Sequence, residues 1–128
     1  MATYLLDTSV IIDATNEKKS QRQLLRALLE EGHLLACCPI NVAEVYAGMR
    51  PKEEKITTQL LRSLRYYSIS FEIAELGGRL RREYGRKGSI ISVTDALIAA
   101  VAIHNGLALI TDNARHFRMK ELVLFVMP

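Results

Sequence analysis

The chain has 128 residues, of which 49% are hydrophobic and 24% are charged. This is the balance of an ordinary globular protein, and it argues against a disordered chain, a fibrous repeat or a disulfide-stapled miniprotein. Lysine and arginine number 17 against 14 acidic residues, so the net charge of +3 permits a nucleic-acid partner without requiring one. We expect a single domain over residues 1–128.

The sequence pattern argues for a cytoplasmic protein. Its longest apolar run, residues 96–103, is far shorter than the roughly 20 residues of a membrane span. The N-terminus has no basic region before Asp7, which argues against a signal peptide. Cys37 and Cys38 are adjacent, and neighbours on a strand point to opposite faces, so we expect two reduced, buried thiols.

The predicted elements alternate between short apolar runs and helical periodicity. In chain order they are a strand at 3–6, a helix from about residue 10, a helix from a capping box at 20–23 to Gly32, a strand at 34–38, a helix at about 41–49, a helix through 56–64, a strand at 66–70, a helix through 73–84, a loop at 85–88, a helix at 93–104 that closes at 105–106, and strands at 107–110 and 122–126. This alternation predicts a parallel sheet covered on both faces. The glycine pair at 77–78 lies inside a predicted helix, where glycine costs stability, so close packing is expected there.

Four acids fall where such a sheet places its ligands, beyond the carboxyl ends of the strands. Asp7 follows the first strand and Asp112 follows the strand at 107–110, whereas Glu44 and Asp95 stand near the starts of helices that should open toward the same edge. Clustered carboxylates repel one another and stay ionised together only around a cation. Oxygen ligands without histidine or cysteine favour Mg²⁺ or Mn²⁺, and a carboxylate-held metal near a basic surface suggests phosphodiester hydrolysis.

Each of these acids also has a structural explanation, because each could cap a helix. The pairings are Asp7 or Ser9 for the helix near residue 10, Asn41 with Glu44, Ser92 with Asp95, and Asp112 for a turn at 113–116. Capping is the commoner role for any single acid. Asp7 is the exception, because an ionised group directly after a buried strand costs free energy to desolvate. The four acids together favour a metal site.

Four motifs, in order along nearly the whole chain, resemble those of PIN-domain ribonucleases, and within that group the VapC-type toxins of toxin–antitoxin pairs. The motifs are YLLDTS at 4–9, NVAEV at 41–45, TDALIAA at 94–100 and LITDNARHF at 109–117. The resemblance implies a three-layer α/β/α PIN-like fold with a central parallel sheet of four or five strands. It also implies an endoribonuclease that depends on Mg²⁺ or Mn²⁺ and leaves 5′-phosphate and 3′-hydroxyl ends.

The resemblance assigns roles residue by residue. Asp7, Glu44 and Asp95 match the family's three acids and are expected to be catalytic metal ligands, with Glu44 either holding the ion or orienting the water. The family's fourth acid often stands where this chain has Asn113, and the carboxylate here is one residue earlier, at Asp112, so either residue could fill that position. Supporting hydrogen bonds are expected from Thr8, Ser9 and Thr111. The expected partners are RNA, a second copy of the chain, and a small VapB-like antitoxin that covers the acids with a basic side chain.

Several other features of the sequence have more than one interpretation. The basic residues Arg79, Arg82, Arg86 and Lys87 either contact RNA phosphates or form a solvated helix face. Tyr66 and Tyr67 could stack on bases, although packing is the commoner role. A Mg²⁺-binding receiver-like signalling domain would need a phosphoacceptor aspartate after a central strand and a lysine after the last one, and neither fits. A PIN-like scaffold that binds RNA without cleaving it is disfavoured by the presence of Asp7, Glu44 and Asp95 together.

Overall fold

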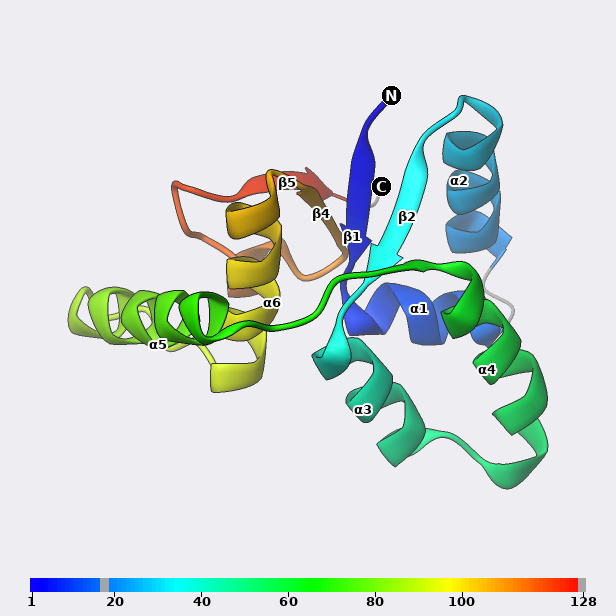
Figure 1. The fold of residues 1–128 in the computed structure, drawn as a ribbon, viewed down its shortest axis with the longest axis horizontal. Helices are drawn as coiled ribbons and strands as arrows, with labels where there is room; N and C mark the ends of the chain where they lie inside the picture. The colour runs from blue at the N-terminus through cyan, green and yellow to red at the C-terminus, as the bar shows by residue number, and fades with distance from the viewer. Residues whose placement is uncertain (17–18, 127–128) are drawn as a thin grey trace.

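The computed structural model describes residues 1–16 and 19–126, and at its centre lies a sheet of five parallel strands in the order β3-β2-β1-β4-β5 (Figure 1). The strands are β1 (Thr3–Leu6), β2 (Leu34–Cys37), β3 (Arg65–Tyr66), β4 (Ala108–Thr111) and β5 (Val123–Val126). The helices are α1 (Thr8–Thr15), α2 (Lys19–Glu30), α3 (Pro39–Gly48), α4 (Glu54–Ser63), α5 (Phe71–Arg86) and α6 (Val93–Asn105), with short 3₁₀ helices η1 (Pro51–Glu53) and η2 (Ala114–His116). The predicted parallel sheet is confirmed, with five strands.

Helices cover the sheet on both faces because successive strand residues point in opposite directions. Leu5 and Leu109 belong to one buried cluster, which they share with α5 and α6. Their neighbours Leu6 and Ile110 belong to a second cluster, with residues of α1, α2, α3 and α4. The fold is therefore the expected three-layer α/β/α arrangement.

The order of the strands reverses at β1, which pairs with β2 on one side and with β4 on the other. Connections leave in opposite directions at such a point, and in open α/β sheets ligands bind there, beyond the carboxyl ends of the strands. Asp7 follows β1 and Asp112 follows β4. The topology therefore brings the first and last predicted acids to the same edge.

Helix α6 begins and ends almost where the sequence predicted. The hydroxyl of Ser92 accepts a hydrogen bond from the backbone N–H of Asp95 at 3.1 Å, and Gly106 ends the helix in the left-handed region at φ +66°. The close packing expected at the glycine pair is confirmed for Gly77, where an added Cβ would lie 2.8 Å from Cδ2 of Leu97. It is wrong for Gly78, which has open space around it.

Several predicted boundaries are wrong, and three of them are informative. The capping box at 20–23 does not start α2, because Lys19 and Ser20 are already helical; the cap position itself lies outside the described residues. The strand predicted at 66–70 is reduced to Arg65–Tyr66, because after the Tyr67 N–H bonds to the Cys37 carbonyl at 2.9 Å, residues 68–70 leave the sheet to reach α5. The loop predicted at 85–88 is helical through Arg86.

Cys37 and Cys38 are free and buried, as expected. Burial raises the pKa of the Cys37 thiol to about 11, so this thiol is not a reactive group. Within residues 1–16 and 19–126, no helix combines the length and the apolar character needed to cross a bilayer.

Candidate active site at the edge of the sheet

The carboxylate of Asp7 is the centre of the candidate site. Its side chain is 6% exposed, and its backbone N–H extends the β1–β4 pairing by donating to the carbonyl of Ile110 at 2.9 Å. One oxygen, Oδ1, accepts from the backbone N–H of Thr8 at 2.8 Å and caps α1. The other, Oδ2, accepts from the hydroxyls of Thr111 at 2.8 Å and Ser9 at 3.4 Å. Asp7 therefore caps a helix and also faces the carboxyl end of β4.

The charged form of Asp7 is destabilised by its surroundings. Burial, above all, raises the pKa of this carboxyl above its usual value of 3.8, and the nearby charge of Asp95 raises it further. The hydrogen bonds from Thr111, Thr8 and Ser9 act in the opposite direction without cancelling the rise. A cation placed near Asp7 and Asp95 would relieve both unfavourable effects.

Glu44 reaches the same region from α3 through Thr8. The Thr8 hydroxyl donates to Oε1 of Glu44 at 2.7 Å. The same hydroxyl accepts a hydrogen bond from Nδ2 of Asn41 at 3.0 Å, and Asn41 is fully buried. Nδ2 also lies 3.1 Å from the carbonyl of Leu6, and Oδ1 accepts from the backbone N–H of Cys38 at 2.8 Å. Asn41 thus ties the ends of β1 and β2 to the hydroxyl that holds Glu44.

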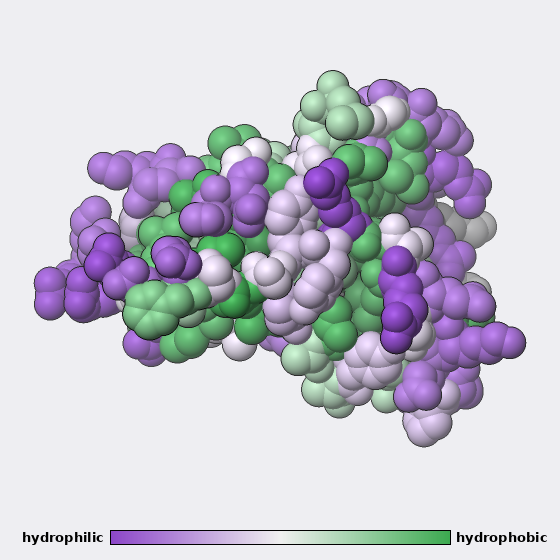
Figure 2. All heavy atoms as spheres, viewed as in Figure 1, coloured by the Kyte–Doolittle hydropathy of each residue, from purple (hydrophilic) through white to green (hydrophobic). Residues whose placement is uncertain are grey.

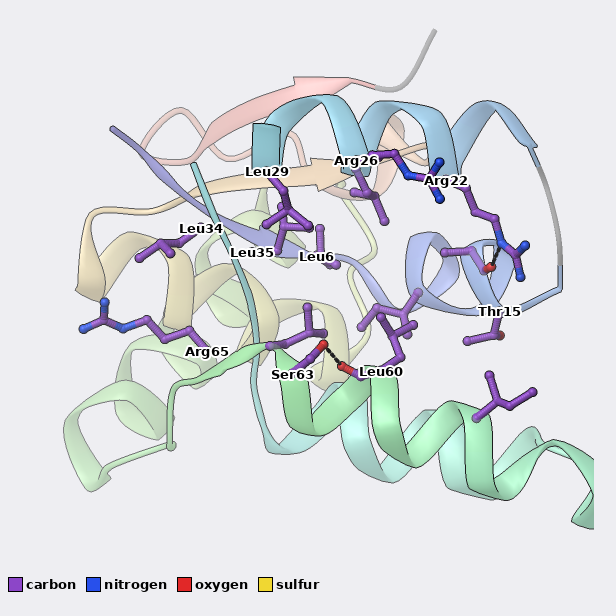
Figure 3. A pocket seen from close by; sticks show the side chains of 15 residues that line it. Leu6, Thr15, Arg22, Arg26, Leu29, Leu34, Leu35, Leu60, Ser63 and Arg65 are labelled. Atoms are coloured by element: carbon purple, nitrogen blue, oxygen red, sulfur yellow. Dashed lines mark hydrogen bonds between the residues drawn. The ribbon is translucent and has the colours of Figure 1, made fainter. Parts of the chain in front are cut away.

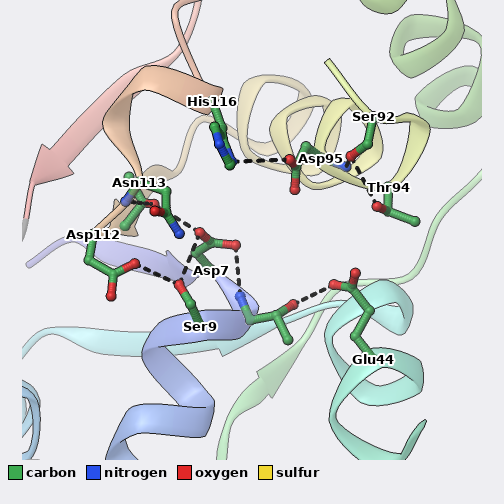
Figure 4. Close-up of polar contacts among 11 residues, drawn as sticks. Asp7, Ser9, Glu44, Ser92, Thr94, Asp95, Asp112, Asn113 and His116 are labelled. Atoms are coloured by element: carbon green, nitrogen blue, oxygen red, sulfur yellow. Dashed lines mark hydrogen bonds and ion pairs between the residues drawn. The ribbon is translucent and has the colours of Figure 1, made fainter. Parts of the chain in front are cut away.

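Asp95 approaches from α6 (Figure 4). Only its backbone N–H takes part in the Ser92 cap described above, so its carboxylate is free of that role. The carboxylate extends toward the space beside Asp7, and its Oδ2 lies 3.8 Å from Nδ1 of His116. Asp95 and Asp7 therefore face each other from different elements, although they are far apart in the sequence.

Asp112 and Asn113 complete the edge after β4. Oδ1 of Asp112 accepts from the Ser9 hydroxyl at 2.7 Å, which links it to the Asp7 side of the site. The alternative that Asp112 caps the following turn is not what the structure shows, because Asn113 is the cap residue of η2. The backbone N–H of Asn113 donates to the Thr111 hydroxyl at 2.9 Å, so Thr111 holds both Asn113 and Asp7.

The side chains gather as a row around Asp7 and not as a closed three-acid cage. Among the residues that the structure describes, no three histidine, cysteine, aspartate or glutamate side chains form a group that could hold a metal ion. The charge of Asp95 acts on Asp7, and Glu44 is hydrogen-bonded to Thr8. Two carboxylates suit Mg²⁺, which keeps several waters and takes only one or two protein carboxylates. The donor set therefore fits a hard cation.

Two residues of the site, Asn41 and His116, have roles that the sequence did not predict. Asn41 was considered only as a helix cap, although a buried amide between apolar neighbours must have hydrogen-bond partners, and this was the available signal. His116 stands in the last predicted motif and faces Asp95, but nothing in the sequence places it beside a residue of another helix.

The basic residues predicted to contact RNA lie along α5. Arg79 pairs with Glu75 at 3.3 Å, and the ammonium of Lys87 lies 4.9 Å from the ring centroid of Tyr84. Arg82 and Arg86 are exposed. In Figure 2 hydrophilic residues gather over the outer end of α5, whereas more apolar residues occupy the centre of that face. Contact between these side chains and RNA stays a prediction.

A second feature is an apolar groove between α2 and α4, over the β1–β2 side of the sheet (Figure 3). Its volume is about 560 Å³, and its walls include Leu29, 53% exposed, and Ile56, 66% exposed. The charged residues that line it are Arg22, Arg26 and Arg65. Arg22 is anchored by a hydrogen bond from Nε to the carbonyl of Ala14 at 2.6 Å. The groove therefore offers an apolar floor with basic ends.

Comparison with known proteins gives one consistent result. The model of the PIN domain family matches residues 4–122. Ribonuclease VapC19 of Mycobacterium tuberculosis is 32% identical over 115 residues, which cover 90% of this chain and 92% of that protein. Ribonuclease VapC2 of Rickettsia felis is 31% identical over 127 residues, which cover 94% and 95%.

Two solved structures also match this chain over nearly its whole length. VapBC2 from Rickettsia felis, bound to a DNA fragment from its promoter, matches with a TM-score of 0.85 and 29% identity over 98% of this chain and 99% of that chain. A toxin–antitoxin complex from Klebsiella pneumoniae matches with a TM-score of 0.79 and 30% identity over 94% and 95%.

Proposed function

Because the chain belongs to the PIN domain family, we propose that it is an endoribonuclease and the toxin of a toxin–antitoxin pair. It hydrolyses RNA phosphodiester bonds at the acidic edge of the sheet, with Mg²⁺ or Mn²⁺ as cofactor. The observation that carries the proposal is the buried carboxylate of Asp7, held by three donors at the point where the strand order reverses and opposed by the charge of Asp95.

The proposed roles of the acids follow from the contacts that each one makes. Asp7 and Asp95 would hold the cation, because they are the pair whose charges oppose each other. When bound, the ion lowers the pKa of a coordinated water and neutralises charge on the phosphate. Glu44, fixed by Thr8, would orient the attacking water or help to hold the ion. Asp112 or Asn113 would fill the fourth position, and Thr111 keeps both near Asp7.

Positioning is the main contribution of the remaining residues. Thr111, Ser9 and the backbone of Thr8 fix the Asp7 carboxylate before substrate arrives, so little reorganisation is needed during reaction. Water attacks the phosphorus in line with the leaving 3′-oxygen, which gives 5′-phosphate and 3′-hydroxyl ends. The scissile phosphate would lie beside the cation that Asp7 and Asp95 hold, where its negative charge is neutralised.

The test compares the cleavage of structured RNA by wild type, Asp7→Asn and Asp95→Asn, with Mg²⁺ and with EDTA. We expect folded variants that cleave at least about 100-fold more slowly than wild type, because each loses a charged group that acts in the transition state. Glu72→Gln removes an exposed acid from α5 and should cleave like wild type. An active Asp7→Asn protein would overturn the assignment, and RNA binding without cleavage by wild type would favour the scaffold.

The groove between α2 and α4 is the docking site that we propose for the antitoxin. The groove is apolar and open to solvent, which suits a partner with an apolar face, and three arginines among its lining residues favour an acidic partner. An amphipathic antitoxin segment with an apolar face and acidic flanks fits this chemistry. The antitoxin would also reach the acids with a basic side chain. The homodimer that the resemblance implies stays a prediction, which light scattering tests.

A further inference from the structure

A separate pocket lies between α3 and α4, on the side of α3 away from Thr8. Its volume is about 540 Å³, and it is lined by Val42, Tyr46, Thr58, Leu61, Arg62, Leu64 and Tyr66. Val42 and Tyr46 form one wall at helical i, i+4 spacing, and Thr58 and Arg62 form the opposite wall with the same spacing. A contact between the hydroxyls of Tyr46 and Thr58 joins the two walls.

The lining has the chemistry of a base-binding site. Tyr46 is 39% exposed and Tyr66 is 57% exposed, so two aromatic rings are open to a ligand. Every base has a flat face that stacks on such rings. Arg62 adds a cation, no acid lines the pocket, and the tyrosine and threonine hydroxyls can both donate and accept hydrogen bonds. A pocket of this volume is large enough for a nucleoside.

The topology places this pocket across α3 from the acids, at the same end of the sheet. Helix α3 starts at the carboxyl end of β2, and Tyr66 ends the parallel strand β3, so both face the sheet edge that carries Asp7. Glu44 and Tyr46 are two residues apart on α3, about 3 Å along the helix axis. Glu44 points to Thr8 and Tyr46 to α4. A strand of RNA held at the acids has to pass over α3, a helix about 10 Å wide, to reach the pocket.

We propose that this pocket binds one unstacked base of the RNA substrate, close to the cleaved bond, through the rings of Tyr46 and Tyr66 and the cation of Arg62. The inference rests on the proposed ribonuclease function. It makes the pocket a determinant of which RNA is cut, because a base that cannot leave its stack cannot enter.

The test is an abasic scan. The binding of a single-stranded RNA that spans the site cut by wild type is measured with Mg²⁺ in the Asp95→Asn background, by fluorescence anisotropy. Each base is removed in turn. We expect one abasic position near the cut to weaken binding about 10-fold, the scale of one stacked base. With Tyr66→Leu added, binding of the intact RNA falls to the same degree, and the abasic position has no further effect. Tyr66→Phe keeps the ring and should preserve both.

Phe71→Leu is the matched control, since it removes a ring that is 78% exposed outside the pocket and should leave binding unchanged. If Tyr66→Leu binds every RNA like its parent, the inference is wrong while the ribonuclease proposal stands. If Tyr66→Leu changes the oligomeric mass and not the RNA affinity, the pocket belongs to a protein interface and the inference is also wrong. Failure of wild type to cleave RNA would instead overturn the proposed function.

Discussion

Asn41 is the residue through which the backbone of the sheet reaches the Glu44 side of the site. Its substitution by alanine leaves the Leu6 carbonyl and the Cys38 N–H without their partner and frees the Thr8 hydroxyl. We expect Asn41→Ala to lower the free energy of unfolding by about 1–3 kcal/mol, measured by urea denaturation, and to slow RNA cleavage at temperatures where the protein is folded.

Asn105→Ala is the control for Asn41→Ala, because it removes a single side-chain bond to the Val101 carbonyl far from the acids. It should cost less stability, about 0.5–1.5 kcal/mol, and leave the cleavage rate unchanged. Equal cleavage by the two variants would show that Asn41 has only a structural role.

The raised pKa of Asp7 predicts how stability without metal depends on pH. Between its usual value of 3.8 and the raised value, the folded chain holds a proton that the unfolded chain has released. The stability of wild type in EDTA therefore falls as the pH rises through this window. Asp7→Asn has no proton to lose at this position. The free energy of unfolding of Asp7→Asn, relative to that of wild type, should therefore increase as the pH rises through the same window. Parallel pH curves from urea denaturation would contradict this.

At the scale of elements, the contact of α5 with α6 depends on a missing side chain. An added Cβ at Gly77 would lie 2.8 Å from Cδ2 and 3.3 Å from Cα of Leu97, whereas one at Gly78 meets nothing within 4 Å. We expect Gly77→Ala to destabilise by about 1–3 kcal/mol and Gly78→Ala to stabilise by about 0.5–1 kcal/mol, measured by thermal or urea unfolding. The same sign for both variants would contradict the proposed packing.

The walls of the apolar groove allow a test of the antitoxin proposal. Ile56→Asp places a charge where a docked apolar helix would bury it, so the proposed antitoxin should inhibit cleavage at least about 10-fold less effectively. Ile90→Asp is the control, because Ile90 is 97% exposed and lies outside the groove. Cleavage without antitoxin should be equal in both variants, and equal inhibition of both would remove the groove as the docking site.

Elements were predictable where local chemistry sets them. Ser92 and Gly106 mark the ends of α6 through a side-chain cap and a left-handed residue, and both signals are present in the sequence. The strand at 66–70 was not predictable, because how many residues of an edge strand pair depends on where the chain must leave for the next helix. The positions of Asp7 and Asp112 followed from parallel strands, but the link from Asn41 through Thr8 to Glu44 depends on how α3 is rotated about its axis.

For the whole molecule, the buried charge of Asp7 and its repulsion by Asp95 predict that a divalent ion stabilises the fold. A ligand that binds only the folded state adds roughly 2.7 kcal/mol at about 100 times its Kd. Mg²⁺ should therefore raise the Tm of wild type and not that of Asp7→Asn or Asp95→Asn, as measured by calorimetry in the absence of RNA. Glu44→Gln distinguishes the two roles of Glu44, since an unchanged Mg²⁺ shift means that Glu44 orients water. A wild-type Tm that does not respond to Mg²⁺ or Mn²⁺ would count against the metal site.

The hydrogen bond between Asp7 and Thr111 joins residues 104 positions apart. During synthesis on the ribosome, Asp7 emerges first, and its Oδ2 gains the Thr111 hydroxyl only when nearly the whole chain has been made. Under the proposed ribonuclease function, a prematurely terminated chain would therefore lack a complete site, and cleavage would begin only after translation is almost finished.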